Sequence, residues 1–127
     1  MKKLSVLSLF VLASCATQFS LPVVGRLSNG DTAQGSVSLE IGNPLGKFEV
    51  FTLSGLNCVG TYDANSTIST LVIPIVCNDG ITGTVIATRD ASLAAGTAEA
   101  RLSNGLSGRF LFGATSAQQQ SEFLDQR

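Results

Sequence analysis

Hydrophobic and polar residues alternate in short runs along most of the chain from residue 21 to residue 113, and turn residues separate the runs. β-Branched and aromatic residues are frequent in these runs, which favours strands over helices. The expected strands are Leu21–Leu27, Thr32–Ile41, Lys47–Leu53, Asn57–Asp63, Leu71–Cys77, Ile81–Thr88, Thr97–Leu102 and Leu106–Gly113. This spacing predicts an all-β domain of about eight antiparallel strands in a meander, arranged as a small barrel or a sandwich.

Asn-Gly and Asp-Gly pairs mark three of the expected turns. Asn29-Gly30, Asp79-Gly80 and Asn104-Gly105 each fit the centre of a two-residue type I′ turn, in which both residues need a positive φ. Residues 42–46 and 89–96 form longer connections, and the second has room for one short helical turn.

One short internal similarity involves these turns. Arg26–Gly30 recurs as Arg101–Gly105, and residues 78–83 loosely parallel residues 104–108. Equivalent loops that present a binding rim would explain the similarity. Similar hairpins also need similar turn residues, and this second interpretation is favoured because a five-residue match is too short to prove a duplication. Either way, turns at one end of a meander lie near one another.

The strand expected at Leu71–Cys77 is apolar at nearly every position, which predicts that both of its faces are covered. Pro74 cannot donate a backbone hydrogen bond, so the strand should have an edge or a bulge there. Phe110 and Phe112 alternate with other residues in the last strand and are predicted to lie in the core. Elsewhere Gly and Ala dilute the pattern, as a closed eight-stranded sheet with a small-residue interior would explain.

Cys58 and Cys77 lie in consecutive expected strands and are predicted to form a disulfide. Opposed residues of an antiparallel pair have numbers with a constant sum, so a tight turn at residues 63–66 would place Cys58 opposite Leu71. That register leaves Cys77 about 20 Å away at ~3.3 Å per residue, whereas a disulfide allows about 4.4–6.8 Å between Cα atoms. A hairpin that opposes the two cysteines and leaves residues 64–71 as a long loop is favoured, and a bridge between two sheets also fits.

The first residues are typical of a secretion signal. Lys2 and Lys3 precede an apolar run at residues 4–13, which is too short for a helix across a bilayer because that needs about 20 residues. The sequence Leu-Ala-Ser-Cys at residues 12–15 resembles the bacterial lipobox, in which signal peptidase II cuts before the cysteine. The resemblance implies a mature chain that begins at Cys15 with fatty acyl groups, such as palmitate, on its sulfur and amine.

The lipoprotein resemblance also sets the expected compartment and domain plan. Ala16 at the second mature position implies sorting to the outer membrane, on its periplasmic side. With Cys15 bound to lipid, Cys58 and Cys77 remain as a pair in an oxidising compartment. The expected plan is a signal peptide at residues 1–14, a tether at 15–20, a β domain at 21–113 and a polar tail at 114–127. The tail is expected either to form a short helix from Ser116 to Asp125 or to be disordered.

Composition excludes several functions. Eight basic and nine acidic residues become six and nine once Lys2 and Lys3 are removed, a net charge of −3 that does not favour nucleic acid. The chain has no histidine, so a Ser-His-Asp triad, a histidine metal site and a histidine general base are excluded. No catalytic residue, metal site or cofactor is therefore predicted, and the chain is not expected to be an enzyme.

The remaining polar residues give only weak candidates for a site. Asp63, Asp79 and Asp90 lie in or beside expected loops, and their spacing matches no recognised calcium loop. Arg26, Arg101 and Arg109 would line a polar patch if their strands were neighbours. The glycine-rich run at residues 80–84 lacks the lysine of a phosphate-binding loop.

Two resemblances complete the analysis. Gly55, Cys58, Gly60, Tyr62-Asp63, Cys77, Asp79-Gly80, Gly83 and Gly113 together resemble a group of small secreted proteins and lipoproteins of alphaproteobacteria, and this resemblance implies no particular activity. A lipid-anchored β-barrel with one disulfide is also similar in architecture to the periplasmic lysozyme inhibitors, but their inhibitory Ser and Lys loops have no counterpart here.

The expected function is a non-catalytic one. The sequence favours an outer-membrane lipoprotein with a binding or structural role, held to the membrane by its lipid and partnered by an envelope protein that the sequence does not identify. Two alternatives are an inhibitor of an envelope-directed hydrolase, such as a lysozyme or a protease, and a prophage-type exclusion lipoprotein. An inhibitor should present a protruding loop, and residues 64–70 are the candidate.

Overall fold

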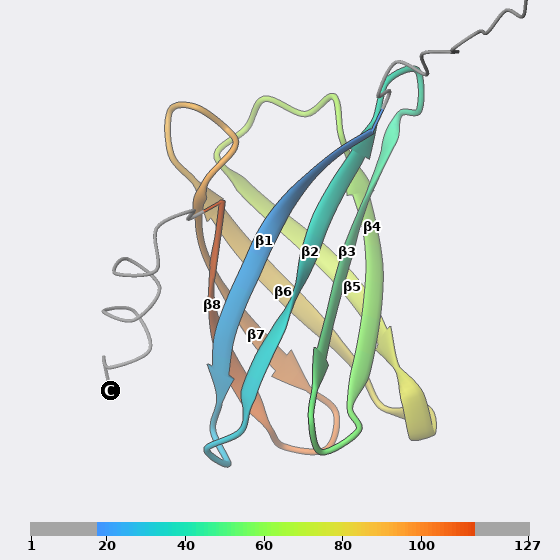
Figure 1. The fold of residues 1–127 in the computed structure, drawn as a ribbon, viewed down its shortest axis with the longest axis vertical. Helices are drawn as coiled ribbons and strands as arrows, with labels where there is room; N and C mark the ends of the chain where they lie inside the picture. Colours follow the sequence, from blue (N-terminus) through green and yellow to red (C-terminus); the bar gives the residue numbers. More distant parts are fainter. Residues whose placement is uncertain (1–17, 114–127) are drawn as a thin grey trace, which may run out of the picture.

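The computed structural model describes residues 18–113, which form eight antiparallel strands closed into one barrel (Figure 1). Each strand pairs with the next along the chain, and β8 returns to pair with β1. The strands are β1 Gln18–Leu27, β2 Thr32–Glu40, β3 Leu45–Thr52, β4 Asn57–Asp63, β5 Thr70–Cys77, β6 Thr82–Arg89, β7 Gly96–Leu102 and β8 Ser107–Phe112. The predicted all-β meander is confirmed, and of the two expected arrangements the chain forms the barrel.

Several element boundaries differ from the predicted ones. β1 begins at Gln18, so residues 18–20 belong to the barrel and not to the tether. Residues 90–95 form a loop without a helical turn, and the single helical element of the described chain is a 3-10 turn at Asn78–Gly80. No helix within residues 18–113 has the length and hydrophobicity needed to span a bilayer. The predicted signal peptide, Cys15 and the tail at 114–127 lie outside the described residues.

Inward and outward residues alternate along the strands. β3, for example, is exposed, buried, exposed, buried along its whole length. The predicted core residues Phe110 and Phe112 point inward and are buried. Small inward residues stand beside large ones: a Cβ on Gly46 would lie 2.3 Å from the ring of Tyr62, and one on Gly25 would lie 2.4 Å from the ring of Phe110. Aromatic rings therefore fill the space that inward glycines leave.

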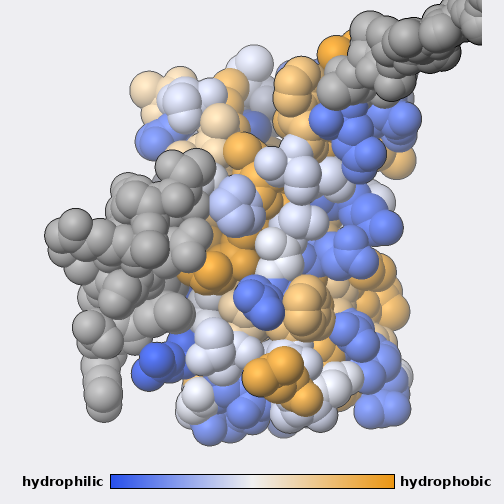
Figure 2. Space-filling model, viewed as in Figure 1, coloured by the Kyte–Doolittle hydropathy of each residue, from blue (hydrophilic) through white to orange (hydrophobic). Residues whose placement is uncertain are grey.

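The prediction that both faces of the Leu71–Cys77 strand are covered is wrong. In β5 the odd-numbered residues are buried, whereas Val72 and Val76 on the outer face are 66% and 60% exposed. A closed barrel has only one covered face, and no second layer packs on this strand within the described chain. The outer side of β5 is apolar but exposed, and Val76 pairs with Val59 while Val72 pairs with Ile86. Apolar side chains also come to the surface among hydrophilic ones on the opposite wall (Figure 2).

Four tight turns lie together at one end of the barrel, which we call the closed end: residues 28–31, 53–56, 78–81 and 103–106 (Figure 1). The connection at residues 41–44 is equally short but lies at the other end. Only the Asp79-Gly80 turn has a positive φ at both residues, as predicted. In the two Asn-Gly turns the glycine alone has a positive φ. The asparagines have another role, because Oδ1 of Asn29 accepts from the backbone N–H of Asp31 and Oδ1 of Asn104 accepts from that of Leu106.

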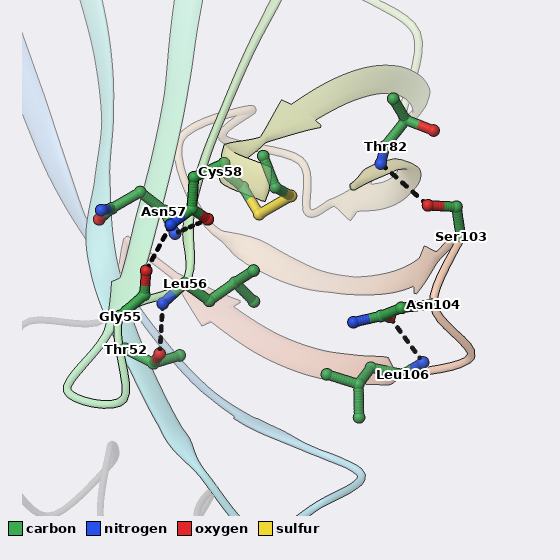
Figure 3. The surroundings of a disulfide bond; sticks show 11 residues. Thr52, Gly55, Leu56, Asn57, Cys58, Thr82, Ser103, Asn104 and Leu106 are labelled. Carbon is green, nitrogen blue, oxygen red and sulfur yellow. Dashed lines mark hydrogen bonds between the residues drawn. A yellow bond between two sulfur atoms is a disulfide. The ribbon is translucent and has the colours of Figure 1, made fainter. Parts of the chain in front are cut away.

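Hydrogen bonds join these four turns into a ring around the closed end. Each turn uses a side chain to reach the turn beside it, and Figure 3 shows part of the ring next to the disulfide. The links are Ser107 N to Ser28 Oγ (3.0 Å), Thr82 N to Ser103 Oγ (3.0 Å), Asn78 Nδ2 to Gly55 O (2.7 Å) and Ser54 Oγ to Asp31 Oδ2 (2.8 Å). The similarity between Arg26–Gly30 and Arg101–Gly105 therefore reflects turn chemistry at the closed end, since Ser28 and Ser103 make equivalent bonds.

A longer repeat underlies that similarity. Gly30, Gly55, Gly80 and Gly105 recur every 25 residues, and all four have a positive φ. The same interval relates four backbone bonds across the turns, from Leu27 N to Asp31 O, Thr52 N to Leu56 O, Cys77 N to Ile81 O and Leu102 N to Leu106 O. The barrel thus consists of four copies of one hairpin. Both termini of each hairpin lie at the end of the barrel opposite the four turns.

Cys58 and Cys77 form the predicted disulfide, with an S–S distance of 2.00 Å, and they oppose each other in the β4–β5 ladder. The predicted register is therefore confirmed near the closed end. It does not continue as far as expected, because the described pairing ends at Gly60 and Ile75. The long loop comprises residues 64–69 and not 64–71, since β5 begins at Thr70.

Pro74 explains where this ladder ends. Its carbonyl oxygen would lie 2.6 Å from a Cβ on Gly60, so the polar groups of this residue face β4. Proline has no N–H to donate, and Pro74 is the residue of β5 immediately beyond the Gly60–Ile75 pair. The predicted irregularity at Pro74 is thus an early end to the β4–β5 pairing, while pairing with β6 continues at Thr84.

Replacing both Cys58 and Cys77 by alanine should lower the free energy of unfolding by about 3 kcal/mol, the stabilisation expected when a disulfide closes a loop of this size. The bond closes a sequence separation of 19 residues. Urea unfolding followed by circular dichroism measures the change. The oxidised wild type should respond to a reductant while the double variant should not, and equal stability of the two oxidised proteins would contradict the prediction.

Candidate ligand-binding cup

A cavity of about 470 Å³ opens at the end of the barrel opposite the closed end, which we call the open end. Its wall comes mainly from apolar inward residues near the ends of the strands: Leu21, Val37, Leu39, Phe48, Leu71, Ile73, Ala87, Ala98 and Phe112. Residues 64–67 and 92–94 of two loops complete the mouth. We call this cavity the cup.

Two of the inward residues that line the cup are alanines. Ala87 and Ala98 oppose each other across β6 and β7, and both line the cup. The half of the barrel nearer the closed end is filled instead, and its remaining space is only about 10 Å³. Phe48 lies between the two halves and meets Phe110 edge to face, with ring centroids 6.2 Å apart. Phe48, supported from below by Phe110, forms the floor of the cup.

Two side chains bring polar groups to the apolar wall. Tyr62 is the inward residue near the end of β4, and its ring packs over Gly46. Burial raises the pKa of the Tyr62 hydroxyl, and the positive charge of Arg89 offsets part of that rise. The phenol is therefore neutral near pH 7 and interacts electrostatically with the arginine.

Arg89 is the last residue of β6 and continues the inward series of Val85 and Ala87. Its Nη2 donates to the carbonyl oxygens of Ser66, at 3.0 Å, and Ile68. Its Nε is buried and has no hydrogen-bond partner among the described residues. The side chain thus holds the 64–69 loop over the mouth, while its Nε is closed off from solvent and makes no hydrogen bond within the described chain.

The acidic residues near the mouth stabilise their own loops. Oδ1 of Asp63 accepts from the backbone N–H of Asn65, at 2.9 Å. Asp90 accepts from the hydroxyl and the backbone N–H of Ser92, and these bonds lower the pKa of its carboxyl. Neither carboxylate lines the cup.

The structure separates most of the polar residues proposed from the sequence. Asp63 and Asp90 lie at the open end and Asp79 at the closed end, so the three do not form one cluster. Within residues 18–113 there is no group of three or more His, Cys, Asp or Glu residues that could hold a metal ion. The glycine-rich run at 80–84 belongs to the closed end and lines no part of the cup.

The structure places the three candidate arginines on the outer wall and part of the long loop in the cup. Arg26 opposes Arg109 across β1 and β8, and Arg109 opposes Glu99 across β7 and β8, while Arg101 pairs with Ser107. These residues therefore share the outer wall, as expected for neighbouring strands. Residues 64–67, part of the loop proposed to protrude in an inhibitor, line the cup instead.

The sequence analysis missed Arg89 and Tyr62 as site residues. The 25-residue repeat carries the signal that would have found Arg89. It makes Leu39, Ala64 and Arg89 equivalent positions, and all three line the cup. Arg89 is charged where the equivalent residues Leu39 and Ala64 are apolar, so it departs from the pattern expected of the core.

Comparison with protein-family models and with curated protein sequences found no match. Three designed proteins share the fold. The redesigned β-barrels mFAP1 and mFAP0, each solved bound to DFHBI, are similar with TM-scores of 0.59 and 0.58 and with 18% and 19% sequence identity; each covers 75% of this chain, which in turn covers 92% and 95% of theirs. A third barrel, a fluorescence-activating protein designed de novo, has a TM-score of 0.54 at 16% identity and covers 76% of this chain, which covers 91% of it.

The contrast between the filled and the empty half predicts how the barrel tolerates added volume. Ala100 faces the filled half and Ala87 the cup. Ala100→Phe should lower the free energy of unfolding by about 1–3 kcal/mol because it overpacks the core. Ala87→Phe should cost less, since its ring enters open space. Urea unfolding of both variants measures the difference, and an equal cost would count against an empty cup.

Proposed function

We propose that this protein is a lipid-anchored, non-catalytic binding protein of the cell envelope whose barrel holds a small apolar ligand in the cup. The observation that carries the proposal is the cup itself. Its volume of about 470 Å³ lies within the range of about 300–1,000 Å³ typical of small-molecule sites. A barrel that only had to be stable would fill both halves, because buried apolar contacts stabilise the fold.

The chemistry of the cup supports binding rather than catalysis. Tyr62 and Arg89 are the titratable residues in its lining. Burial moves the pKa of Tyr62 away from neutral pH, and an arginine side chain carries a fixed positive charge. Neither is suited to act as a general base near pH 7. A few polar groups in an apolar wall are instead what orients a bound ligand.

Two further observations support the proposal. The designed barrels mFAP1 and mFAP0 share the fold and were solved with a small molecule bound, so a barrel of this kind can serve as a container. The lipobox resemblance at residues 12–15 supports the anchor and the envelope location, on the periplasmic side of the outer membrane.

Binding can be tested with the neutral dye N-phenyl-1-naphthylamine, which becomes fluorescent in apolar surroundings. Residues 16–127, secreted behind a cleavable non-lipoprotein leader, contain the whole barrel and avoid detergent. Wild type should enhance the fluorescence of the dye with saturation at one site. Ala87→Phe should abolish the enhancement because its ring occupies the cup.

Thr88→Phe is the matched control. Thr88 neighbours Ala87 on β6 but is exposed on the outer wall, so this variant adds the same ring without filling the cup. It should bind the dye as wild type does. Equal enhancement by wild type and folded Ala87→Phe would show that the dye binds elsewhere and would contradict the proposal.

A further inference from the structure

Arg89 places one fixed positive charge in an otherwise uncharged cup. The residues that line the cavity include no aspartate or glutamate. The salt bridge between Lys47 and Glu49 lies on the outer wall, away from the cup. Arg89 bonds only to neutral carbonyl oxygens, and its Nε is buried without a partner within residues 18–113. A half-buried charge of this kind favours an anion.

The shape of the cup indicates where the anion would lie. Arg89 ends β6 at the mouth, beside the 64–69 loop that it holds. The hydroxyl-bearing Tyr62 is close enough for the charge of Arg89 to affect it. Below them the wall is apolar down to the floor at Phe48. The cup thus fits a molecule with an anionic head at the mouth and an apolar chain directed toward the closed end.

The rim of the cup is also apolar. Phe19 at the start of β1, Ile41 and Leu45 around the β2–β3 loop, and Ile68 in the β4–β5 loop are each more than half exposed. At the closed end Leu53 is the one large apolar side chain exposed in the turns. Apolar side chains gathered around one opening favour contact with a lipid surface.

The chain enters the barrel at this same end. Gln18 pairs with Glu40 beside the β2–β3 loop, and only residues 16 and 17 separate it from Cys15. Even fully extended, three residues span about 10 Å. An acyl anchor on Cys15 would therefore hold the apolar rim, and not the closed end, against the membrane.

We propose that the barrel stands with its mouth on the bilayer and takes from it a single-chain carboxylate of the fatty-acid type, which lies with its chain in the cup and its carboxylate at Arg89. This inference rests on the proposed function and deepens it by naming the ligand class and its source. Binding breaks no covalent bond. The carboxylate would pair with the guanidinium of Arg89, which lines the cup, and the phenol of Tyr62 could donate a hydrogen bond.

Competition against the neutral dye tests the ligand class. Dodecanoic acid should displace the dye from residues 16–127 at concentrations about ten- to hundredfold lower than dodecanol or methyl dodecanoate, the gain expected from a charge-assisted hydrogen bond. Arg89→Gln should remove this preference, so that the acid and the alcohol displace the dye at similar concentrations. Arg89→Lys should keep part of it. Arg101→Gln, an exposed arginine on the outer wall, should behave as wild type.

The outcomes separate the two proposals. No dye binding by folded wild type would overturn the proposed function. Dye binding with equal displacement by the acid and the alcohol would overturn the ligand class and leave the proposed function in place. Because Arg89 also holds the 64–69 loop, Arg89→Gln could lose structure. The acid-to-alcohol ratio of wild type and the Arg89→Lys variant decide the question in that case.

Tryptophan scanning of the acylated protein tests the orientation, because the chain has no tryptophan of its own. Full-length protein, shown by intact mass to begin at an acylated Cys15, is bound to phosphatidylcholine vesicles that contain brominated lipid. A tryptophan from Ile68→Trp at the rim should be strongly quenched. One from Leu53→Trp, 96% exposed at the closed end, should not.

The result of this test is also unambiguous. Quenching of both tryptophans alike, or of Leu53→Trp alone, would overturn the mouth-down orientation. A mature protein without acyl chains, which stays unbound to vesicles, would instead overturn the anchor on which the proposed function depends.

Discussion

The pairing of β8 with β1 is the constraint on which the rest of the structure depends. Closure gives every strand two neighbours, so the barrel has no free edge strand. It also divides the residues of each strand into an inward set that shares one limited volume and an outward set that meets solvent. Whether that volume is filled or empty then depends on the inward side chains and on the loops that cover each end.

The two ends of the barrel differ in how tightly they are bonded and packed. The closed end holds the turn ring, the Cys58–Cys77 disulfide and the filled half of the core. The open end has the two longest loops, at residues 64–69 and 90–95, the early end of the β4–β5 ladder and the empty half. Residues near the cup, such as Ala87 and Ala98, forgo buried apolar contacts that larger side chains would make. A tightly bonded closed end can offset that loss without restricting access to the cup.

Local patterns in the sequence predicted the elements well because strands and turns depend on neighbouring residues. The alternation in Lys47–Leu53 and the Asp79-Gly80 pair each specify a structure by themselves. The register of Cys58 against Cys77 also followed, since a disulfide fixes a distance. The covered outer face expected for β5 was wrong because apolar character alone does not distinguish a buried strand from an apolar outer wall, as Val72 and Val76 show.

The cup could not be predicted in the same way, because a cavity depends on residues from many strands at one level of the barrel. Only the 25-residue repeat aligns those levels, and it places Arg89 with Leu39 and Ala64. Leu39 and Ala64 are apolar, as expected at a level that faces the inside of the barrel, whereas Arg89 brings a cation to the same level. A charge is costly at a site screened from water unless something compensates it. Two neutral carbonyl groups accept hydrogen bonds from the guanidinium without supplying an opposite charge, and the anion that we propose at the mouth would supply it.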